Sequence, residues 1–277
     1  MKKRILALAL AALVFALTFS LAGCGTKAED NTSAVEGSSQ EATKTTFTMG
    51  IDPEYPPFSY LGDDGEYTGF DVEVCKAVCD YLGWEFDIFA VNWDQKLVQL
   101  DSDECDCIWS GMTILPSMTE AGYIISRPYF DNEQVLVVKE DSSFNSSKDL
   151  AGKAVAVQLG TSGEALLDGD LKELKDTFSD VITANSFTSC FTELAGGAVD
   201  AVFVDAPVAE DYVSSHDGFR IIDEDLGAEQ YGIAFRSGDA ELCAQVEAAL
   251  DAIIENGTYA SIVEKYPDIA GNLLLTR

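Results

Sequence analysis

The sequence predicts an α/β protein built from two similar lobes, each with a doubly wound sheet, joined by two segments that cross between them. Three observations support this. Strand and helix patterns alternate as β-α-β-α-β over residues 46–110, the alternation returns over residues 154–204, and two further strand patterns connect the halves. Such alternation is typical of mostly parallel sheets covered by helices.

The first half opens with an amphipathic strand. Phe47, Met49 and Ile51 alternate with polar residues, which is the period of a half-buried strand. In the next helix the apolar residues keep helical spacing, and Gly83 stands where a C-terminal cap belongs. The elements predicted here are the strands Thr46–Ile51, Glu85–Val91 and Cys105–Ser110 and the helices Phe70–Leu82 and Asp94–Leu100.

The second half repeats this order. The predicted elements are strands at Ala154–Gln158, Val181–Ala184 and Ala201–Val204, helices from Glu164 and near Phe187, further strands at Val135–Lys139 and Tyr231–Phe235, and closing helices at Asp239–Asn256 and from Thr258. Two such units predict a cleft between lobes. Because open α/β sheets bind ligands beyond the carboxyl ends of their strands, we expect the ligand site there.

Composition and charge exclude several classes of function. Of the 277 residues, 47% are hydrophobic, which is too apolar for a disordered chain. The 48 acidic and 17 basic residues give a net charge of −31, which disfavours nucleic acid as a partner. The single histidine, His216, and the lack of a C-x-x-C pair argue against histidine-dependent catalysis and common metal sites. No metal or cofactor is expected.

Residues 1–23 have the pattern of a secretory signal peptide. A basic start precedes the apolar run Ile5–Leu17, and the segment Leu21–Cys24 follows. This segment resembles the lipobox of bacterial lipoproteins, which implies cleavage after Gly23 and a lipid anchor, with diacylglycerol and palmitate, on Cys24. The alternative is an uncleaved transmembrane anchor. Both place the rest of the chain on the extracytoplasmic face of the cell membrane.

Residues 24–46 are expected to be the lipidated cysteine and a flexible tether. They are rich in Ser, Thr, Glu and Gly and contain no aromatic residue, so they cannot bury a core. The remaining chain is strongly acidic, and an acidic surface does not adhere to anionic lipid head groups. The lipid on Cys24, and not a basic patch, would therefore hold the protein at the membrane.

Seven short segments at strand ends and helix starts carry a family resemblance. They are Ile51–Phe58, Gly69–Val72, Asp106–Thr113, Gly152–Glu164, Val199–Asp205, Tyr231–Phe235 and Glu255–Tyr259. In this order they resemble the family 3 extracellular solute-binding proteins, the polar amino acid receptors of ABC importers. The resemblance implies a receptor with the two-lobe periplasmic-binding-protein-like fold of type II, and not an enzyme.

The resemblance also implies how the chain divides. Lobe 1 would contain residues 47–131 and 231–277, and lobe 2 would contain residues 132–230. A two-segment hinge would lie at the ends of lobe 2, near Asp131–Val135 and Leu226–Tyr231. Binding would then proceed by closure of the lobes about this hinge.

Four side chains have the most specific implied roles. Asp52 and Asp205 correspond to acids that hold the ligand's ammonium group, one from each lobe, through charge-assisted hydrogen bonds. Tyr55 and Trp93 correspond to aromatic residues that sandwich the ligand side chain. Each also has an ordinary explanation, because Asp52 suits a turn, Asp205 suits a helix cap and Trp93 suits a core.

Further implied contacts come from a strand end and a helix start. Thr161 and Ser162 stand at a helix N-terminus, where free N–H groups suit a carboxylate. Gln158 corresponds to a position that varies with the ligand side chain. The strand end that would exchange hydrogen bonds with the ligand consists of Ser110, Gly111, Met112 and Thr113.

One position departs from the family pattern. The family usually has Thr-x-x-x-x-Arg after the third strand, and that arginine binds the ligand's α-carboxylate. Here the run Thr113–Met118 ends in methionine. Either Arg127 or backbone N–H groups replace the arginine, or the ligand is a cationic amine or a carboxylate-blocked amino acid.

The leading interpretation is a monomeric, membrane-anchored receptor that captures an amino acid or related small nitrogenous solute and delivers it to an ABC permease. A second is a dehydratase-like enzyme on the same fold, with Glu164 and Asp205 as acid and base, although no nucleophile–base pair is visible. A third is a sensor or adhesin that contacts another protein.

Six cysteines follow Cys24, and their spacing does not favour disulfides. Two lie one helical turn apart, and two alternate along a strand. We expect all six to be buried free thiols that act as small hydrophobic residues.

Overall fold

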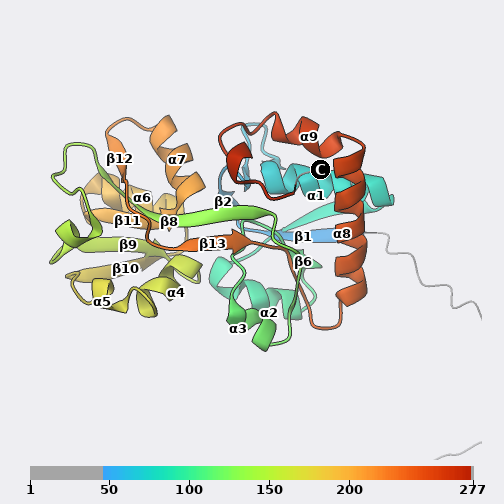
Figure 1. The fold of residues 1–277 in the computed structure, drawn as a ribbon, viewed down its shortest axis with the longest axis horizontal. Coiled ribbons are helices and arrows are strands. Elements are labelled where there is room, and N and C mark those ends of the chain that lie inside the picture. The colour runs from blue at the N-terminus through green and yellow to red at the C-terminus, as the bar shows by residue number, and fades with distance from the viewer. Residues whose placement is uncertain (1–45, 276–277) are drawn as a thin grey trace, which may run out of the picture. The chain divides into compact units, whose positions relative to one another are not determined.

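The computed structural model describes residues 46–275, which form two α/β lobes (Figure 1). The signal-peptide, lipidation and tether predictions fall on residues 1–45 and lie outside the described residues. Within residues 46–275, no helix combines the length and apolar character that a bilayer crossing requires. The two lobes confirm the predicted fold class.

The first lobe is built on a five-stranded sheet with the order β5-β1-β6-β14-β7. Its strands are β1 (Thr46–Ile51), β5 (Glu85–Ala90), β6 (Cys107–Ile108), β7 (Ile124–Ile125) and β14 (Ala234–Phe235). β1 pairs in parallel with β5 and β6, whereas β14 is antiparallel to β6 and β7. The alternation in β1 predicted its packing correctly, since Phe47, Met49 and Ile51 are fully buried.

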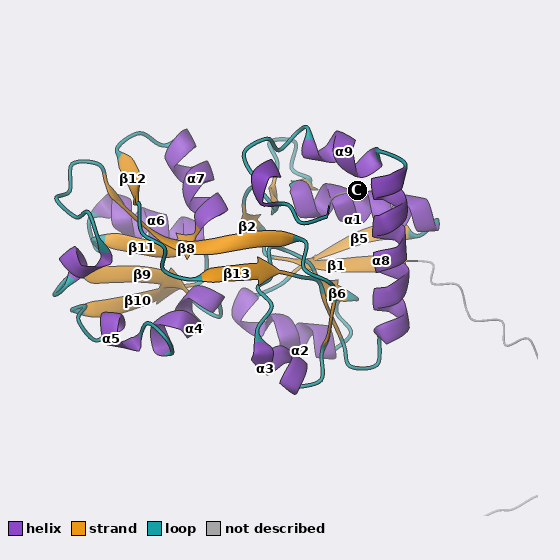
Figure 2. Cartoon of the chain, viewed as in Figure 1, coloured by secondary structure: helices purple, strands orange, loops and turns teal. Residues whose placement is uncertain are grey.

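Helices cover both faces of this sheet. They are α1 (Phe70–Leu82), η1 (Trp93–Gln95), α2 (Lys96–Asp101), α3 (Pro116–Glu120), α8 (Ala240–Glu255), α9 (Thr258–Val263) and η3 (Ala270–Asn272). Figure 2 shows α1 and α9 on one side and α2 and α3 on the other, with α8 upright at the end of the lobe, where it packs against α1 and α9. The predicted bounds of α1 are confirmed, and Gly83 ends the helix in the left-handed conformation.

The second lobe repeats the architecture with the strand order β10-β9-β11-β8-β12. Its elements are β8 (Phe130–Lys139), η2 (Ser147–Leu150), β9 (Ala154–Gln158), α4 (Ser162–Asp168), α5 (Lys172–Lys175), β10 (Asp180–Ala184), α6 (Phe187–Gly196), β11 (Ala201–Asp205), α7 (Ala206–Ser215) and β12 (Phe219–Ile222). β9 is parallel to β10 and β11, and β8 is antiparallel to β11 and β12. Because β9 and β11 are parallel, they end at the same edge of the sheet. Figure 1 shows that this edge faces the first lobe.

Two strands run between the lobes. β8 pairs with β13 (Ala228–Tyr231) in antiparallel register, from Ala228 opposite Glu133 to Tyr231 opposite Phe130. The sequence predicted one strand over Tyr231–Phe235, but the structure has two, β13 and β14. The reason is that the chain leaves β8 at Gly232, whose N–H donates to the Met112 carbonyl, and then joins the sheet of the first lobe.

Other differences from the sequence prediction concern strands of two to four residues. The third strand of the first lobe is only Cys107–Ile108, shorter than the predicted Cys105–Ser110. A small sheet of β2 (Glu54–Tyr55), β3 (Ser59–Leu61) and β4 (Tyr67–Thr68) was not predicted, because strands of two or three residues are too short to show a period. β12 was also missed.

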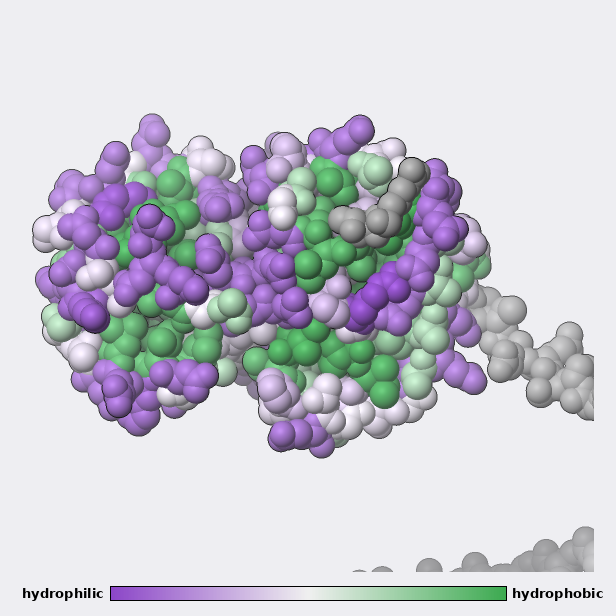
Figure 3. Space-filling view, in the orientation of Figure 1, coloured by the Kyte–Doolittle hydropathy of each residue, from purple (hydrophilic) through white to green (hydrophobic). Residues whose placement is uncertain are grey.

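The six described cysteines are buried and free, as expected. Cys75, Cys79 and Cys107 are fully buried in the largest apolar cluster of the described residues. On the outer surface, hydrophilic residues cover the edges of both lobes, and a notch separates the lobes at the lower edge of the view (Figure 3).

Gly69 provides a test of the packing that leads into α1. Its φ is +125°, and a Cβ there would lie 2.3 Å from the Phe58 carbonyl oxygen. We expect Gly69→Ala to lower the free energy of unfolding by about 3 kcal/mol or more, because both strain and a backbone clash arise. The control Gly65→Ala has a similar left-handed strain, φ +85°, but open space around it, and should lose only about 1 kcal/mol. Urea denaturation measures both, and equal losses would contradict the steric argument.

Candidate functional site

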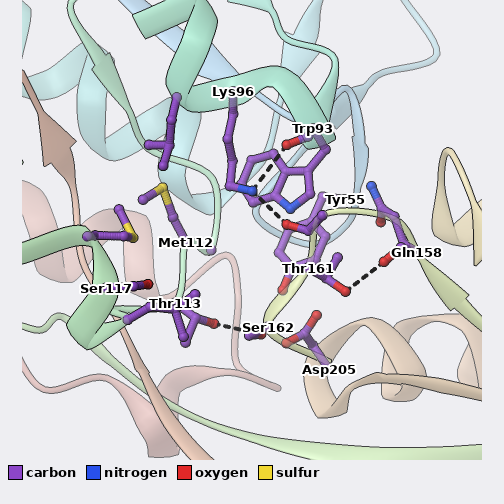
Figure 4. A pocket seen from close by; sticks show the side chains of 15 residues that line it. Tyr55, Trp93, Lys96, Met112, Thr113, Ser117, Gln158, Thr161, Ser162 and Asp205 are labelled. Atoms are coloured by element: carbon purple, nitrogen blue, oxygen red, sulfur yellow. Dashed lines mark hydrogen bonds between the residues drawn. The ribbon is translucent and has the colours of Figure 1, made fainter. Parts of the chain in front are cut away.

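A cavity of about 120 Å³ lies between the lobes, where β9 and β11 end. Both lobes contribute to its wall (Figure 4). Its lining residues are Tyr55, Trp93, Lys96, Leu97, Gly111, Met112, Thr113, Leu115, Ser117 and Met118 from the first lobe and Gln158, Gly160, Thr161, Ser162 and Asp205 from the second. The expected position of the ligand site, at the carboxyl ends of strands, is therefore where the structure has a cavity.

Most of the predicted site residues line this cavity. They are Tyr55, Trp93, Gly111, Met112, Thr113, Met118, Gln158, Thr161, Ser162 and Asp205. Asp52 and Ser110 are the exceptions, since they lie behind the wall. The Asp52 N–H donates to Ser110 Oγ at 3.1 Å, and Ser110 Oγ lies 2.6 Å from Ser59 Oγ. Ser110 thus supports the loop that carries Asp52.

Asp52 connects the lobes instead of facing the cavity. Its Oδ2 accepts a hydrogen bond from Gln158 Nε2 at 2.6 Å, and its Oδ1 accepts one from the Glu54 N–H at 2.9 Å. Burial raises the pKa of the Asp52 carboxyl, although these two hydrogen bonds act in the opposite direction. The side-chain amide of Gln158 therefore takes the hydrogen bond of Asp52 Oδ2 that the sequence prediction gave to the ligand's ammonium group.

Asp205 has the position expected of a ligand-binding acid. It is the residue before α7, but its side chain makes no capping hydrogen bond, so the ordinary explanation as a helix cap is wrong. Its Oδ1 accepts from Asn132 Nδ2 and Gln134 Nε2, each at 2.7 Å. Burial, and after it repulsion from Glu229, raises the pKa of the Asp205 carboxyl to about 7.

Hydroxyl groups surround the two acids at this end of the cavity. Thr113 Oγ1 donates to Glu229 Oε2 at 2.8 Å, and Ser162 Oγ donates to the same oxygen at 3.0 Å. The Tyr55 hydroxyl lies 2.7 Å from the Tyr231 hydroxyl. These contacts hold the polar end of the cavity in place with neutral donors.

The two predicted aromatic residues both lie in the wall, but their environments differ. The ring of Tyr55 packs on Phe58 and Phe187, at centroid distances of 5.6 and 6.0 Å. The ring of Trp93 has the Lys96 ammonium group 4.6 Å from its centroid, a cation–π contact. Trp93 therefore has a cation of the protein next to its ring.

Sequence reasoning did not place five of the lining residues in the site, and Lys96 is the charged one among them; the others are Leu97, Leu115, Ser117 and Gly160. Its Nζ donates to the Trp93 carbonyl at 3.1 Å and to the Gly160 carbonyl at 2.6 Å. Burial lowers the pKa of the lysine to about 8, even though the carboxylate of Asp52 acts to raise it. The available signal was a lysine three residues after a predicted ligand-binding tryptophan, on the same face of a short helix.

The arginines of the described residues do not reach this cavity. Arg127 forms an ion pair with Asp251 on the outer surface. Arg236 bonds the carbonyls of Leu100 and Cys105, and Arg220 bonds carbonyls in the second lobe. Met118 is buried in the cavity wall at the position where the family pattern has arginine.

The lobes touch across the cavity, in a closed arrangement. Cross-lobe hydrogen bonds join Gln158 to Asp52 and Lys96 to Gly160. The backbone of Gly160 lies so near Asp94 that a Cβ on the glycine would stand 2.6 Å from Asp94 Cα. Only a glycine fits this approach without a shift of one lobe.

The groups suggested for other chemistry have structural partners. Glu164 Oε2 accepts from the Gly160 N–H at 2.7 Å, and Glu164 is not among the residues that line the cavity with Asp205. His216 stacks on Tyr212 after α7. Within residues 46–275, no cluster of His, Cys, Asp and Glu has the geometry to hold a metal ion.

Known proteins with related sequences bind amino acids. The arginine-binding extracellular protein ArtP of Bacillus subtilis (strain 168) is 32% identical over 270 residues, which cover 96% of this chain and 98% of that protein. The L-cystine-binding protein TcyJ of Escherichia coli (strain K12) is 32% identical over 224 residues, which cover 80% of this chain and 82% of that protein.

Solved structures give the same picture. The substrate-binding protein of an ABC uptake transporter from Streptococcus pneumoniae, with bound histidine, superposes with a TM-score of 0.78 at 25% identity, over 84% of this chain and 95% of that one. The sequence model of the bacterial extracellular solute-binding proteins, family 3, matches residues 47–268. From the match over most of the described residues and the cavity between two α/β lobes, we conclude that this chain belongs to the family 3 bacterial extracellular solute-binding proteins.

Proposed function

We propose that this protein is the membrane-anchored, extracytoplasmic substrate-binding component of an ABC importer for an amino acid or a related small nitrogenous solute. The observation that carries the proposal is the Asp205 carboxylate, which lines the cavity and has only neutral hydrogen-bond donors. A ligand ammonium group would supply the missing positive charge. Relatives named for arginine, cystine and histidine support the same class of ligand.

Capture would proceed by closure of two lobes, with residues 47–131 and 231–277 in one and residues 132–230 in the other. β8 and β13 would bend at the hinge, near Asp131–Val135 and Leu226–Tyr231. A ligand that contacts both walls favours the closed arrangement, because open lobes cannot make both sets of contacts. A binding role, and no catalytic one, follows from this scheme.

Delivery would require a membrane location and a permease. Family 3 solute-binding proteins act outside the cytoplasm. We assign the anchor to a lipid on Cys24, with the following residues as tether, and the partner to an ABC permease in the cytoplasmic membrane. The binding protein would act as a monomer.

A second ligand class remains in the proposal because of Met118. A methionine in the cavity wall offers no charge to an α-carboxylate. A cationic amine or a carboxylate-blocked amino acid would bind Asp205 through its ammonium group and would need no positively charged partner for an α-carboxylate. The two ligand classes differ in whether a free α-carboxylate is present, so a calorimetric titration with members of both classes separates them.

Calorimetric titration of the purified protein with the standard amino acids, cystine, amino acid amides and simple amines tests the function. We expect saturable one-to-one binding for at least one of these solutes, together with a higher melting temperature, because a ligand that binds only the folded state stabilises it. If no solute on this panel binds, the receptor function is wrong. Product formation from a bound solute would instead favour an enzyme.

Gly160 tests whether closure is needed for binding. We expect Gly160→Ala to weaken binding by about tenfold or more, since the new Cβ would meet the Asp94 backbone and keep the lobes apart. Gly152→Ala is a matched control, because φ is +73° there and +75° at Gly160, but no atom lies near its Cβ. Small-angle X-ray scattering with ligand should show a more open Gly160→Ala variant. Equal affinity in the two variants would contradict the closure mechanism.

Asp205 makes binding depend on pH. In the ligand-free protein its pKa is raised to about 7, and a bound ammonium group lowers it, so binding releases a proton below that pH. Affinity should therefore be constant just above pH 7 and fall by up to about tenfold per unit as the pH drops below 7. Titrations at pH 5.5, 6.5 and 7.5 measure this. Asp205→Asn should bind weakly at all three, and an unchanged slope in that variant would remove Asp205 from the ammonium site.

A further inference from the structure

Lys96 lines the cavity between the lobes, whereas most lysines lie on the outer surface of a protein. It begins α2 directly after η1, and its side chain reaches back along the ring of Trp93 to the wall between the lobes. Figure 4 shows its ammonium group directed into the cavity between Trp93 and the loop that carries Thr161. It is thus a cation held at the surface that a ligand would touch.

The ammonium group has one hydrogen-bond donor to spare. A lysine ammonium has three N–H donors and no acceptor. Two are used by the carbonyls of Trp93 and Gly160. Among the hydrogen bonds that the described residues make with each other, no acceptor takes the third. A carbonyl supplies only a partial charge. The carboxylates of Asp52, Asp94 and Glu164 act on this cation electrostatically, but none of them takes a hydrogen bond from it, so the third N–H has no charged acceptor among the described residues.

The charges of the cavity wall form a pair of opposite sign. Among the lining residues, Lys96 is the one cationic side chain and Asp205 the one anionic side chain. They come from different lobes and enter the cavity from opposite sides in Figure 4. A solute that carries both an ammonium and a carboxylate group matches this wall, whereas an amine matches only half of it.

We propose that Lys96 binds a carboxylate of the solute and so takes over the anion-binding role that Met118 cannot perform. The inference rests on the proposed function and narrows it to zwitterionic amino acids. The carboxylate is either the α-carboxylate or one on the side chain, which share the same chemistry. The competing explanation is that Lys96 only latches the lobes together through the Gly160 carbonyl.

Paired ligands separate these explanations. For the amino acid that binds best, the α-amide removes the α-carboxylate charge and changes little else, and Glu against Gln and Asp against Asn do the same for a side-chain carboxylate. The wild-type protein should prefer the acid over its amide by about tenfold or more in at least one of these pairs. Lys96→Met should reduce that ratio to less than about threefold, and Lys96→Arg should largely restore it.

The control is Lys76→Met, which removes the same charge from the exposed surface of α1 and should keep the wild-type ratio. If Lys96→Met weakens acid and amide by the same factor, Lys96 is only a latch and the proposal is overturned. A wild-type protein that binds solutes but does not prefer the acid in any pair also overturns it, without any variant. If the wild-type protein binds no solute at all, the receptor function itself fails.

Discussion

The buried carboxylate of Asp205 is the constraint around which the site is organised. An isolated carboxylate is costly to bury, and here the neighbouring groups are amides, hydroxyls and a second acid, Glu229. Burial, and after it the repulsion from Glu229, therefore raises the pKa of the Asp205 carboxyl to about 7. Such a group gains much from a partner that brings positive charge and little from one that does not, so in the proposed function charge would be the first criterion of ligand selection.

The two carboxylates that the sequence singled out have separate tasks. Asp52 and Asp205 both follow buried strands, and their neighbours in sequence gave no reason to treat them differently. The difference arises from the folded structure: the amide of Gln158 crosses from the opposite lobe and bonds Asp52, whereas Asp205 is held by Asn132 and Gln134 and lines the cavity. Local sequence patterns do not predict a contact between residues about a hundred positions apart, such as Gln158 and Asp52. The role of Asp52 therefore could not be predicted from the sequence.

The fold was largely predictable because its strands and helices have clear periods. α1 and β9 were predicted with their actual bounds, since apolar residues mark one face or form a buried run. The short strands of the β2–β4 sheet and the break at Gly232 depend on tertiary hydrogen bonds and left no local trace. In the site, the wall residues were found through strand ends, whereas Lys96 was missed because a lysine on a short helix is usually exposed.

The paired strands between the lobes have a mechanical consequence. β8 and β13 are neighbours in one antiparallel ladder, and their backbone hydrogen bonds fix the spacing and register of the two connections. Sliding one lobe past the other would break that ladder, whereas flexing both strands at the same level leaves it intact. In the proposed closure, the lobes would therefore rotate about one axis across β8 and β13, and the cavity residues opposite this axis would approach one another most.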